Sequence, residues 1–311
     1  MQHLLGRIIL DEVHEYVGDL ASGKPFRPAH KLLADLVQIR GVPIMLMSGT
    51  IPPSALPAFF AYLQLSAEEF KSLRQPCVRQ DIHIGLYKTV SSQRPSEAAL
   101  AVCKRVVPYV EDHLAHHRSW KAILFCHSIK SVVATTELLG GQYPGCVTSF
   151  WADKEDGIEC LEAWRAGQQH IMVSTTALMA GIHEDNIRLI VAVCLPYGLT
   201  GLWQGINRGG RDGCGAIACV IDDSTASQAR HGTNPEDAGT SGHDWDVNGQ
   251  AAYVRFVAER KCLRRPLEHF FDGTSPDNVA CCADIPNVQS SCSLCSTEIA
   301  QLVSGELSDG P

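Results

Sequence analysis

The stretch from Ile171 to Gly213 constrains the fold most, because it alternates apolar runs with polar or glycine-rich segments. Such runs are typical of buried parallel strands, which present polar groups where each strand ends. The run beginning at Ile171 ends in Ser174-Thr175-Thr176, and a second run covers residues 189–193. The sequence therefore predicts an α/β fold with a parallel sheet.

The next segment carries Gln204, Arg208 and Arg211 among glycines. If this segment starts a helix, the three side chains lie at i, i+4 and i+7 and share one face. Two adjacent guanidiniums suit the charge that develops on a transferring γ-phosphoryl group. The alternative is a solvated basic turn beside a glycine-rich loop.

An earlier apolar run, Arg7 to Leu10, delivers Asp11, Glu12 and His14 at its end. In open α/β sheets, ligands bind at this end of the strands. Asp11 would hold Mg²⁺ through water, and Glu12 would orient and polarise the attacking water. His14 could link the nucleotide site to a second lobe. An acidic helix N-terminus is the alternative for this pair of carboxylates.

Residues 42–47 form another apolar run, which ends in Ser48-Gly49-Thr50 before the breaker Pro52-Pro53. Hydroxyls at a strand end can form hydrogen bonds with neighbouring carboxylates. We therefore expect Ser48 and Thr50 to report the state of the nucleotide to a distant site.

The order of these segments resembles that of the RecQ family of superfamily 2 DNA helicases. Residues 11–14 resemble motif II, residues 48–50 motif III, residues 122–128 motif IV, residues 174–181 motif V, and residues 204–213 motif VI. Lys24-Pro25-Phe26-Arg27-Pro28 matches the end of the family's aromatic-rich loop. The resemblance covers roughly residues 6–295.

This resemblance implies two RecA-like lobes that bind ATP and Mg²⁺ between them. It also implies 3′ to 5′ unwinding of single-stranded or forked duplex DNA in recombination and repair, in the nucleus. Phe26 and Arg27 would couple DNA contact to hydrolysis, Ser174 and Thr175 belong to the nucleic-acid motifs, and Gln204, Arg208 and Arg211 would contact the γ-phosphate across the cleft.

The family places a Gly-Lys-Ser/Thr phosphate loop well before motif II, whereas only ten residues precede Asp11 here. Ser22-Gly23-Lys24-Pro25 does not replace that loop, because it follows the carboxylates and puts proline after the lysine. We therefore expect an N-terminally truncated chain that does not hydrolyse ATP efficiently alone. The alternative function is a non-catalytic DNA-binding or partner-binding module derived from a helicase.

Thirteen cysteines are present, and most of those before residue 220 lie in apolar surroundings, as small buried residues do. The C-terminal ones differ. Cys292 and Cys295 have the spacing with which thiolates on a tight turn chelate tetrahedral Zn²⁺. The resemblance implies a structural zinc site of one helical and three loop cysteines, for which we choose Cys262, Cys282, Cys292 and Cys295, with Cys281 as the alternate. Free surface thiols are the other interpretation.

The pattern of the chain predicts five segments. These are a remnant of a first RecA-like lobe (1–75) with an exposed apolar face, a complete second lobe (76–221), a flexible insertion (222–250), a small helical zinc-binding subdomain (251–300) and a tail (301–311). Within them we expect strands at 82–87, 122–126, 171–174 and 189–193, and helical structure at 99–116, 132–139 and 251–271.

Composition fits an intracellular soluble protein: 45% of residues are hydrophobic, and no apolar run is long enough to span a membrane. The formal charge of −8 means that local basic patches must bind DNA. The clearest basic cluster lies between Arg255 and Arg265, and its alternative is a solvated helix face. Protein partners cannot be predicted from these patterns.

Overall fold

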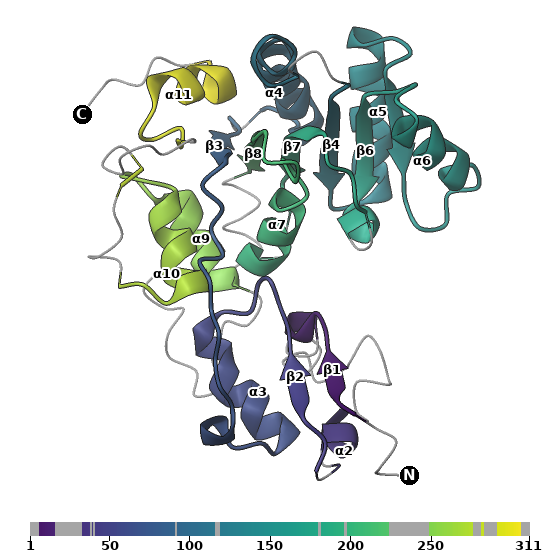
Figure 1. Cartoon of the computed structure of the whole chain (residues 1–311). Coiled ribbons are helices and arrows are strands. Elements are labelled where there is room, and N and C mark those ends of the chain that lie inside the picture. Colours follow the sequence, from purple (N-terminus) through teal and green to yellow (C-terminus); the bar gives the residue numbers. More distant parts are fainter. Residues whose placement is uncertain are drawn as a thin grey trace.

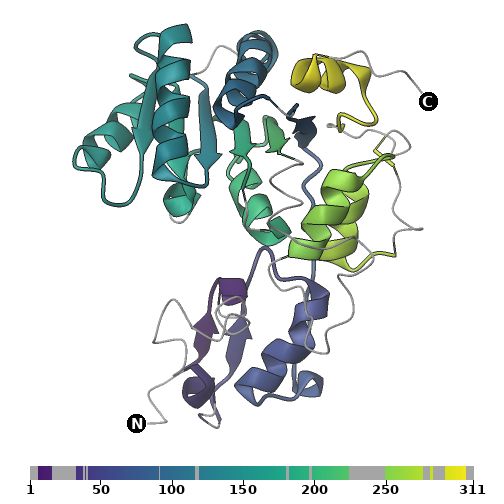
Figure 2. The same cartoon turned by 180° about the vertical axis from the view of Figure 1, so that it is seen from behind.

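The computed structural model describes residues 6–15, 33–37, 39, 41–90, 92–115, 119–179, 182–195, 198–223, 249–275, 281–282 and 291–305. Figures 1 and 2 show a small body formed by the N-terminal part of the chain below a larger body built around a sheet. The expected aromatic-rich loop with Phe26 and Arg27 lies outside the described residues, and so does most of the expected insertion at 222–250.

The small body contains two short parallel strands, β1 (Ile8–Leu10) and β2 (Ile44–Leu46), as the apolar runs predict. Helix α3 (Leu56–Leu63) covers one face of this pair, and its Phe59 packs with Ile8 and Leu10 in a buried cluster. Helix α2 (Leu33–Val37) adds Val37 to the same cluster.

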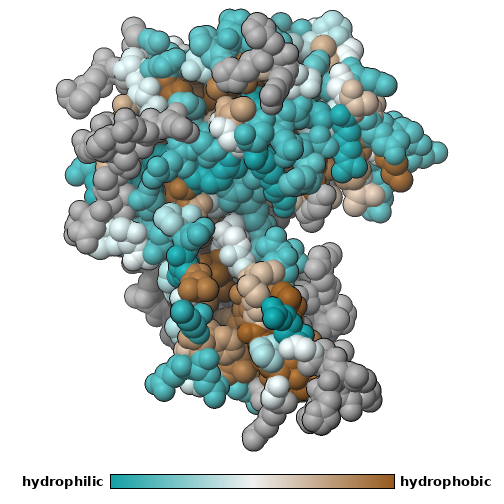
Figure 3. Space-filling view, viewed as in Figure 1, coloured by the Kyte–Doolittle hydropathy of each residue, from teal (hydrophilic) through white to brown (hydrophobic). Residues whose placement is uncertain are grey.

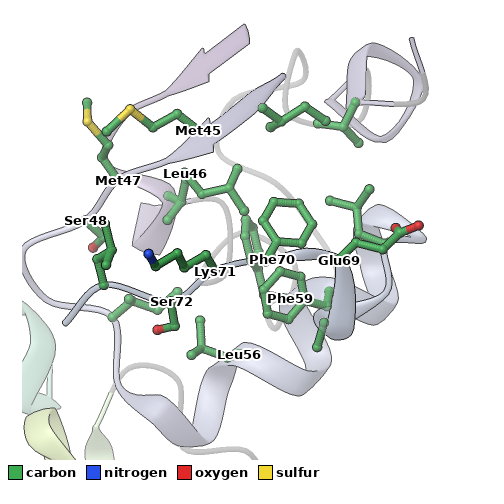
Figure 4. Close-up of a pocket in the computed structure, with 18 of the residues that line it drawn as sticks. Met45, Leu46, Met47, Ser48, Leu56, Phe59, Glu69, Phe70, Lys71 and Ser72 are labelled. Carbon is green, nitrogen blue, oxygen red and sulfur yellow. The ribbon is translucent and has the colours of Figure 1, made fainter. Parts of the chain in front are cut away.

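The other face of this pair of strands exposes apolar side chains. Ile9 and Met45 are register partners and are 50% and 49% exposed. The space-filling view shows apolar surface gathered over this body (Figure 3). A hollow of about 1490 Å³ also opens between β2, α3 and the segment that follows α3, and its lining includes Leu46, Phe59 and Phe70 (Figure 4). Parallel sheets are normally covered on both faces, so this body exposes surface that such sheets usually bury.

The larger body is built on a six-stranded sheet. The strands are β3 (Ile82–Lys88), β4 (Lys121–Cys126), β5 (Val147–Phe150), β6 (Ile171–Thr175), β7 (Ile187–Val193) and β8 (Ala216–Asp222). Their order is β3-β8-β7-β4-β6-β5, and all neighbouring strands are parallel. Four of its strands match the four predicted apolar runs. The sequence did not predict β5 or β8. β5 lies at the edge of the sheet and contains two hydroxyl residues, and β8 contains small side chains, which have a low preference for strands.

Helices cover both faces of this sheet, as expected for a parallel sheet. One core cluster joins residues of the sheet to α4 (Pro95–Tyr109), α5 (Ile129–Gln142) and α11 (Thr297–Ser304). A π-helical turn, Val110–Leu114, extends α4. The cluster on the opposite face includes residues of α6 (Gly157–Arg165), α7 (Gly198–Ile206), α9 (Gln250–Ala258) and α10 (Arg264–Asp272).

The helical structure predicted for 251–271 is divided into α9 and α10, with Cys262 between them. Pro266 accounts for the break, because a proline ring clashes with the carbonyl four residues earlier and lacks an N–H. In the first turn of α10 the same residue is tolerated.

The C-terminal tail expected from residue 301 is also different. Helix α11 continues to Ser304, and Arg105 of α4 donates hydrogen bonds to the carbonyls of Leu302 at 3.1 Å and Val303 at 2.5 Å. Residues 301–304 therefore belong to the packed body, because the side chain of an earlier helix binds the end of α11.

The two bodies meet where the chain passes from one to the other. Arg74 donates hydrogen bonds to the carbonyls of Ile51 at 3.0 Å and Phe271 at 2.8 Å. The Cys77 amide donates to Asp272 Oδ1 at 2.7 Å. The end of α10 therefore holds the connection between the bodies.

Candidate functional site

Two parallel strands bring the predicted carboxylates and hydroxyls to one edge. Leu10 and Leu46 are register partners, so the residues that follow β1 and β2 leave the sheet side by side. Backbone hydrogen bonds continue this pairing, from Val13 N to Met47 O at 3.0 Å and from Met47 N to Leu10 O at 2.8 Å. As a result, the Asp11–His14 segment lies beside Ser48.

Glu12 has a left-handed backbone with a φ of 50°, which is uncommon for a residue other than glycine. Its amide donates to Asp11 Oδ1 at 2.8 Å. Burial raises the pKa of the Glu12 carboxyl, repulsion from Asp11 raises it further, and attraction to Arg208 opposes both effects. The higher pKa makes this carboxylate a better proton acceptor than an ordinary exposed glutamate.

His14 connects the two bodies. Its side chain is buried, its Nδ1 lies 2.9 Å from Ser48 Oγ and 3.3 Å from Glu12 Oε2, and its Nε2 contacts the side-chain amide of Gln204. Burial lowers the pKa of His14, which favours the neutral ring. With the Gln204 amide as donor, Nε2 accepts and Nδ1 carries the proton that is shared with Ser48 and Glu12. Ser48 Oγ also accepts the Thr50 amide at 3.2 Å.

The prediction that Gln204, Arg208 and Arg211 share a helix face is wrong. Helix α7 ends at Ile206, so only Gln204 lies on it, and the arginines follow in a turn. Gly210 lies in this turn with a φ of 57°, and its amide donates to Ile187 O at 2.8 Å. A side chain there would meet the Gly215 backbone at 2.9 Å.

The turn nevertheless brings the two guanidiniums together. Arg208 Nη1 and Arg211 Nη1 lie 3.3 and 3.4 Å from the carbonyl of Ile182, and Arg211 Nη1 lies 2.7 Å from His183 Nδ1. Burial lowers the pKa of Arg208, repulsion from Arg211 acts in the same direction, and attraction to Glu12 opposes both. The turn therefore places two adjacent cations near the Glu12 carboxylate, which attracts Arg208.

Arg79 holds this turn and was missed by the sequence analysis. Its guanidinium donates to the carbonyls of Gly209 at 2.5 Å and Gly210 at 2.6 Å, between the two arginines, and to Asp81 Oδ1 at 2.9 Å. Buried Arg264 of α10 in turn donates to the Arg79 carbonyl at 2.9 Å. An arginine in a short linker has no spacing signal, so only tertiary structure reveals this contact.

The structure does not bring Ser174 and Thr175 into this network. Ser174 is buried at the end of β6, and its hydroxyl donates to the Thr175 carbonyl at 2.8 Å. The two residues end a strand of the larger sheet, apart from the hydrogen-bonded set around His14.

Five cysteine thiols gather near the C-terminus, where α9 and α10 meet the loop before α11. Cys262, Cys281, Cys282 and Cys295 have sulfur atoms within 4.8 Å of one another. Cys292 lies 3.9 Å from Cys262, 3.6 Å from Cys282 and 3.4 Å from Cys295, measured between Sγ atoms. A set with Cys281 and a set with Cys292 are therefore both close enough to share one metal ion.

The sulfur separations favour Cys292 over Cys281. Zn–S bonds of about 2.3 Å in a tetrahedron place sulfur atoms about 3.8 Å apart. The Cys262–Cys282 distance of 3.6 Å and the distances from Cys292 approach this value, whereas Cys281 lies only 3.0 Å from Cys295. The donor set that best fits a tetrahedral ion is Cys262, Cys282, Cys292 and Cys295.

The cysteine loop is joined to the edge of the sheet at β3. Ile84 N donates to Ser291 O at 3.1 Å, Ser293 N donates to Ile84 O at 2.9 Å, and Cys292 forms a bridge with Ile84. The Leu263 amide donates to Cys292 Sγ at 3.4 Å. The cluster thus connects α10, the loop before α11 and the sheet.

Comparison with known families agrees with this architecture. Residues 105–213 match the model of the helicase conserved C-terminal domain. This stretch of the chain is similar to that domain. The chain is 24% identical over 213 residues to ATP-dependent helicase SGS1 of Saccharomyces cerevisiae and 26% identical over 223 residues to ATP-dependent DNA helicase hus2/rqh1 of Schizosaccharomyces pombe. The chain is thus similar to two ATP-dependent helicases, in agreement with the helicase resemblance of its motifs.

The alignments cover 67% and 68% of this chain but only 13% and 15% of the length of SGS1 and hus2/rqh1. Among solved structures, a Dbp5 variant from S. cerevisiae bound to RNA and ADP BeF3 matches with a TM-score of 0.51 and 14% identity. This match covers 73% of this chain and 57% of that chain. It shows that the chain has an α/β RecA-like fold. In the described part of the chain, no helix is both long and apolar enough to cross a membrane.

Proposed function

We propose that this chain is part of an ATP-dependent DNA helicase of the RecQ type, in which a nucleoside triphosphate binds between the two bodies. The observation that carries the proposal is the contact of His14 with Gln204, beside the attraction between Glu12 and Arg208. Residues of motif II and motif VI thereby meet across the boundary between the bodies.

The proposed roles follow from charge and position. Glu12, whose pKa is raised, would accept a proton from the attacking water, and Arg208 and Arg211 would stabilise charge on the γ-phosphoryl group. Asp11 would hold Mg²⁺ through water, and that ion supplies neutralisation of phosphate charge when bound. Ser48, Thr50 and His14 would transmit the state of the nucleotide between the bodies.

The nucleic-acid roles belong to the same proposal. Ser174 and Thr175, with Phe26 and Arg27, would contact single-stranded or forked DNA during 3′ to 5′ unwinding in recombination and repair. Cys262, Cys282, Cys292 and Cys295 would hold a structural Zn²⁺, because four soft thiolates at these separations suit that ion. Similarity to the ATP-dependent DNA helicase hus2/rqh1 supports DNA as the substrate, and the resemblance to RecQ helicases implies the nucleus as the location.

The 311 residues contain no Gly-Lys-Ser/Thr sequence. Phosphate loops of that kind supply most of the backbone amides that hold a triphosphate. We therefore infer that these residues alone bind nucleotide weakly and do not hydrolyse ATP efficiently. DNA-stimulated ATPase activity of the purified chain would contradict this inference.

Calorimetric titration with ADP and beryllium fluoride in the presence of Mg²⁺ tests the nucleotide site. We expect weak binding that Arg208→Ala and Arg211→Ala each reduce by about tenfold or more, because each change removes a charge-assisted hydrogen bond. Arg94→Ala is the matched control, since Arg94 is an exposed arginine paired with Glu97 at the start of α4. If the two turn variants and the control bind equally, the nucleotide site is elsewhere.

The alternative function is a non-catalytic DNA-binding or partner-binding module derived from a helicase. Fluorescence anisotropy with a labelled forked duplex distinguishes the two. A module binds DNA with the same affinity with or without ADP, beryllium fluoride and Mg²⁺, whereas a motor body changes its DNA affinity when the nucleotide site is occupied.

A further inference from the structure

The cysteine cluster contains one more thiol than a tetrahedral ion requires. A closed structural zinc site uses four ligands. The set with the best sulfur separations leaves Cys281 outside, yet Cys281 Sγ lies 3.0 Å from Sγ of the ligand-set residue Cys295. The other sulfur–sulfur contacts in the cluster are longer: 3.6 Å between Cys262 and Cys282, and 3.9, 3.6 and 3.4 Å from Cys292 to Cys262, Cys282 and Cys295.

Exposure separates the same two thiols from the rest. Cys262, Cys282 and Cys292 have relative exposures of 0%, 4% and 0%, whereas Cys281 and Cys295 are half-buried. Oxidants that arrive from solvent reach accessible thiols first. The closest pair of thiols is therefore also the accessible pair.

We propose that Cys281 and Cys295 are a peroxide-sensitive pair that forms a disulfide and thereby dismantles the metal-binding set. Hydrogen peroxide transfers one oxygen to the Cys281 thiol, which gives a sulfenic acid and one water. The Cys295 sulfur then attacks the Cys281 sulfur, and the hydroxyl group leaves with a proton as a second water. That proton comes from the Cys295 thiol when no metal is bound, and from solvent when Cys295 is a zinc-bound thiolate. Without metal, two thiols and one peroxide thus become one disulfide and two waters.

The consequence reaches the sheet, and this part rests on the proposed zinc site. Once Cys295 is in a disulfide, only Cys262, Cys282 and Cys292 remain as ligands, so the ion is held less tightly. The loop that carries Cys292 pairs with Ile84 at the edge of the sheet. Loss of the ion would loosen this loop and the start of α11 that follows it.

The test uses the full chain, loaded with zinc under reducing conditions and then exposed to hydrogen peroxide. A colorimetric chelator follows zinc release, and mass spectrometry of protease fragments maps the disulfide. We expect release of zinc together with a peptide pair that links Cys281 to Cys295. Zinc release with a disulfide between other cysteines would contradict the proposal, and so would full retention of zinc.

Cys281→Ser separates the extra thiol from the ligands. This variant should bind zinc as well as wild type when reduced, and should resist release by peroxide. Loss of zinc by the reduced variant would show that Cys281 is a ligand, and release at the wild-type rate would show that it is not the sensitive thiol; either result overturns the proposal. Cys214→Ser is the control, because Cys214 is a half-buried thiol in another loop.

Failure of the zinc site and failure of the thiol pair can be told apart. If the reduced wild-type chain binds no zinc, the zinc proposal fails, and disulfide mapping still decides the pairing. A Cys281–Cys295 link in that experiment supports the thiol pair, and its absence overturns it.

Discussion

His14 Nε2 contacts the side-chain amide of Gln204, although the two residues are 190 positions apart in the chain. His14 follows a strand of the small body, and Gln204 lies near the end of a helix on the large sheet. The contact therefore forms only when both bodies are folded and lie in this position relative to each other.

Gln204→Ala should lower the free energy of unfolding by about 1 kcal/mol, because it removes one hydrogen bond to a buried ring. His14→Ala should cost more, since this ring also contacts Ser48 and Glu12. In a double-mutant cycle measured by urea denaturation, the two changes should be non-additive. Gln301→Ala on the exposed face of α11 is the control. Strict additivity would mean that the contact contributes nothing.

The pKa of His14 should lie below its ordinary value of 6.5, because burial disfavours the charged ring. The folded state then binds fewer protons than the unfolded state, so this stabilisation is present above pH 6.5 and is lost as pH falls through the lowered pKa. NMR titration of the imidazole measures the shift. His83 is half-buried and also has a lowered pKa, so His14→Gln is needed to assign the resonances. A value at or above 6.5 would contradict the neutral ring.

Arg79→Ala should loosen the turn that carries Arg208 and Arg211, because the carbonyls of Gly209 and Gly210 lose their donor. We expect a loss of about 2 kcal/mol in stability and faster hydrogen exchange across residues 207–213. Arg79→Lys should restore part of the protection, since lysine keeps the charge but not the forked geometry. Faster exchange spread evenly over the chain would indicate general destabilisation instead.

Cys292→Ser should abolish zinc binding, whereas Cys281→Ser should not. The reason is that Cys292 lies at ligand-like separations from three other thiols. Zinc content by mass spectrometry after dialysis measures the difference, and circular dichroism checks that the sheet remains folded. Retention of zinc by Cys292→Ser would assign the fourth ligand to Cys281.

Local pattern was sufficient to predict much of the fold. Runs such as residues 122–126 and 189–193 are apolar throughout because strands in the middle of a covered parallel sheet are buried on both faces. The break before Pro266 and the end of α7 before Arg208 were not predicted, because a single proline or glycine changes a helical pattern at only one position. The functional roles assigned to the site residues remain predictions.

The sequence by itself determined which groups stand at the ends of the strands, because side-chain periodicity and strand ends are properties of neighbouring residues. Only the tertiary structure decided that His14 meets Gln204, that Arg79 binds the turn between two arginines, and that Cys281 lies beside Cys295. Those contacts join segments far apart in the chain, and their geometry depends on how whole helices and strands pack, which no local pattern encodes.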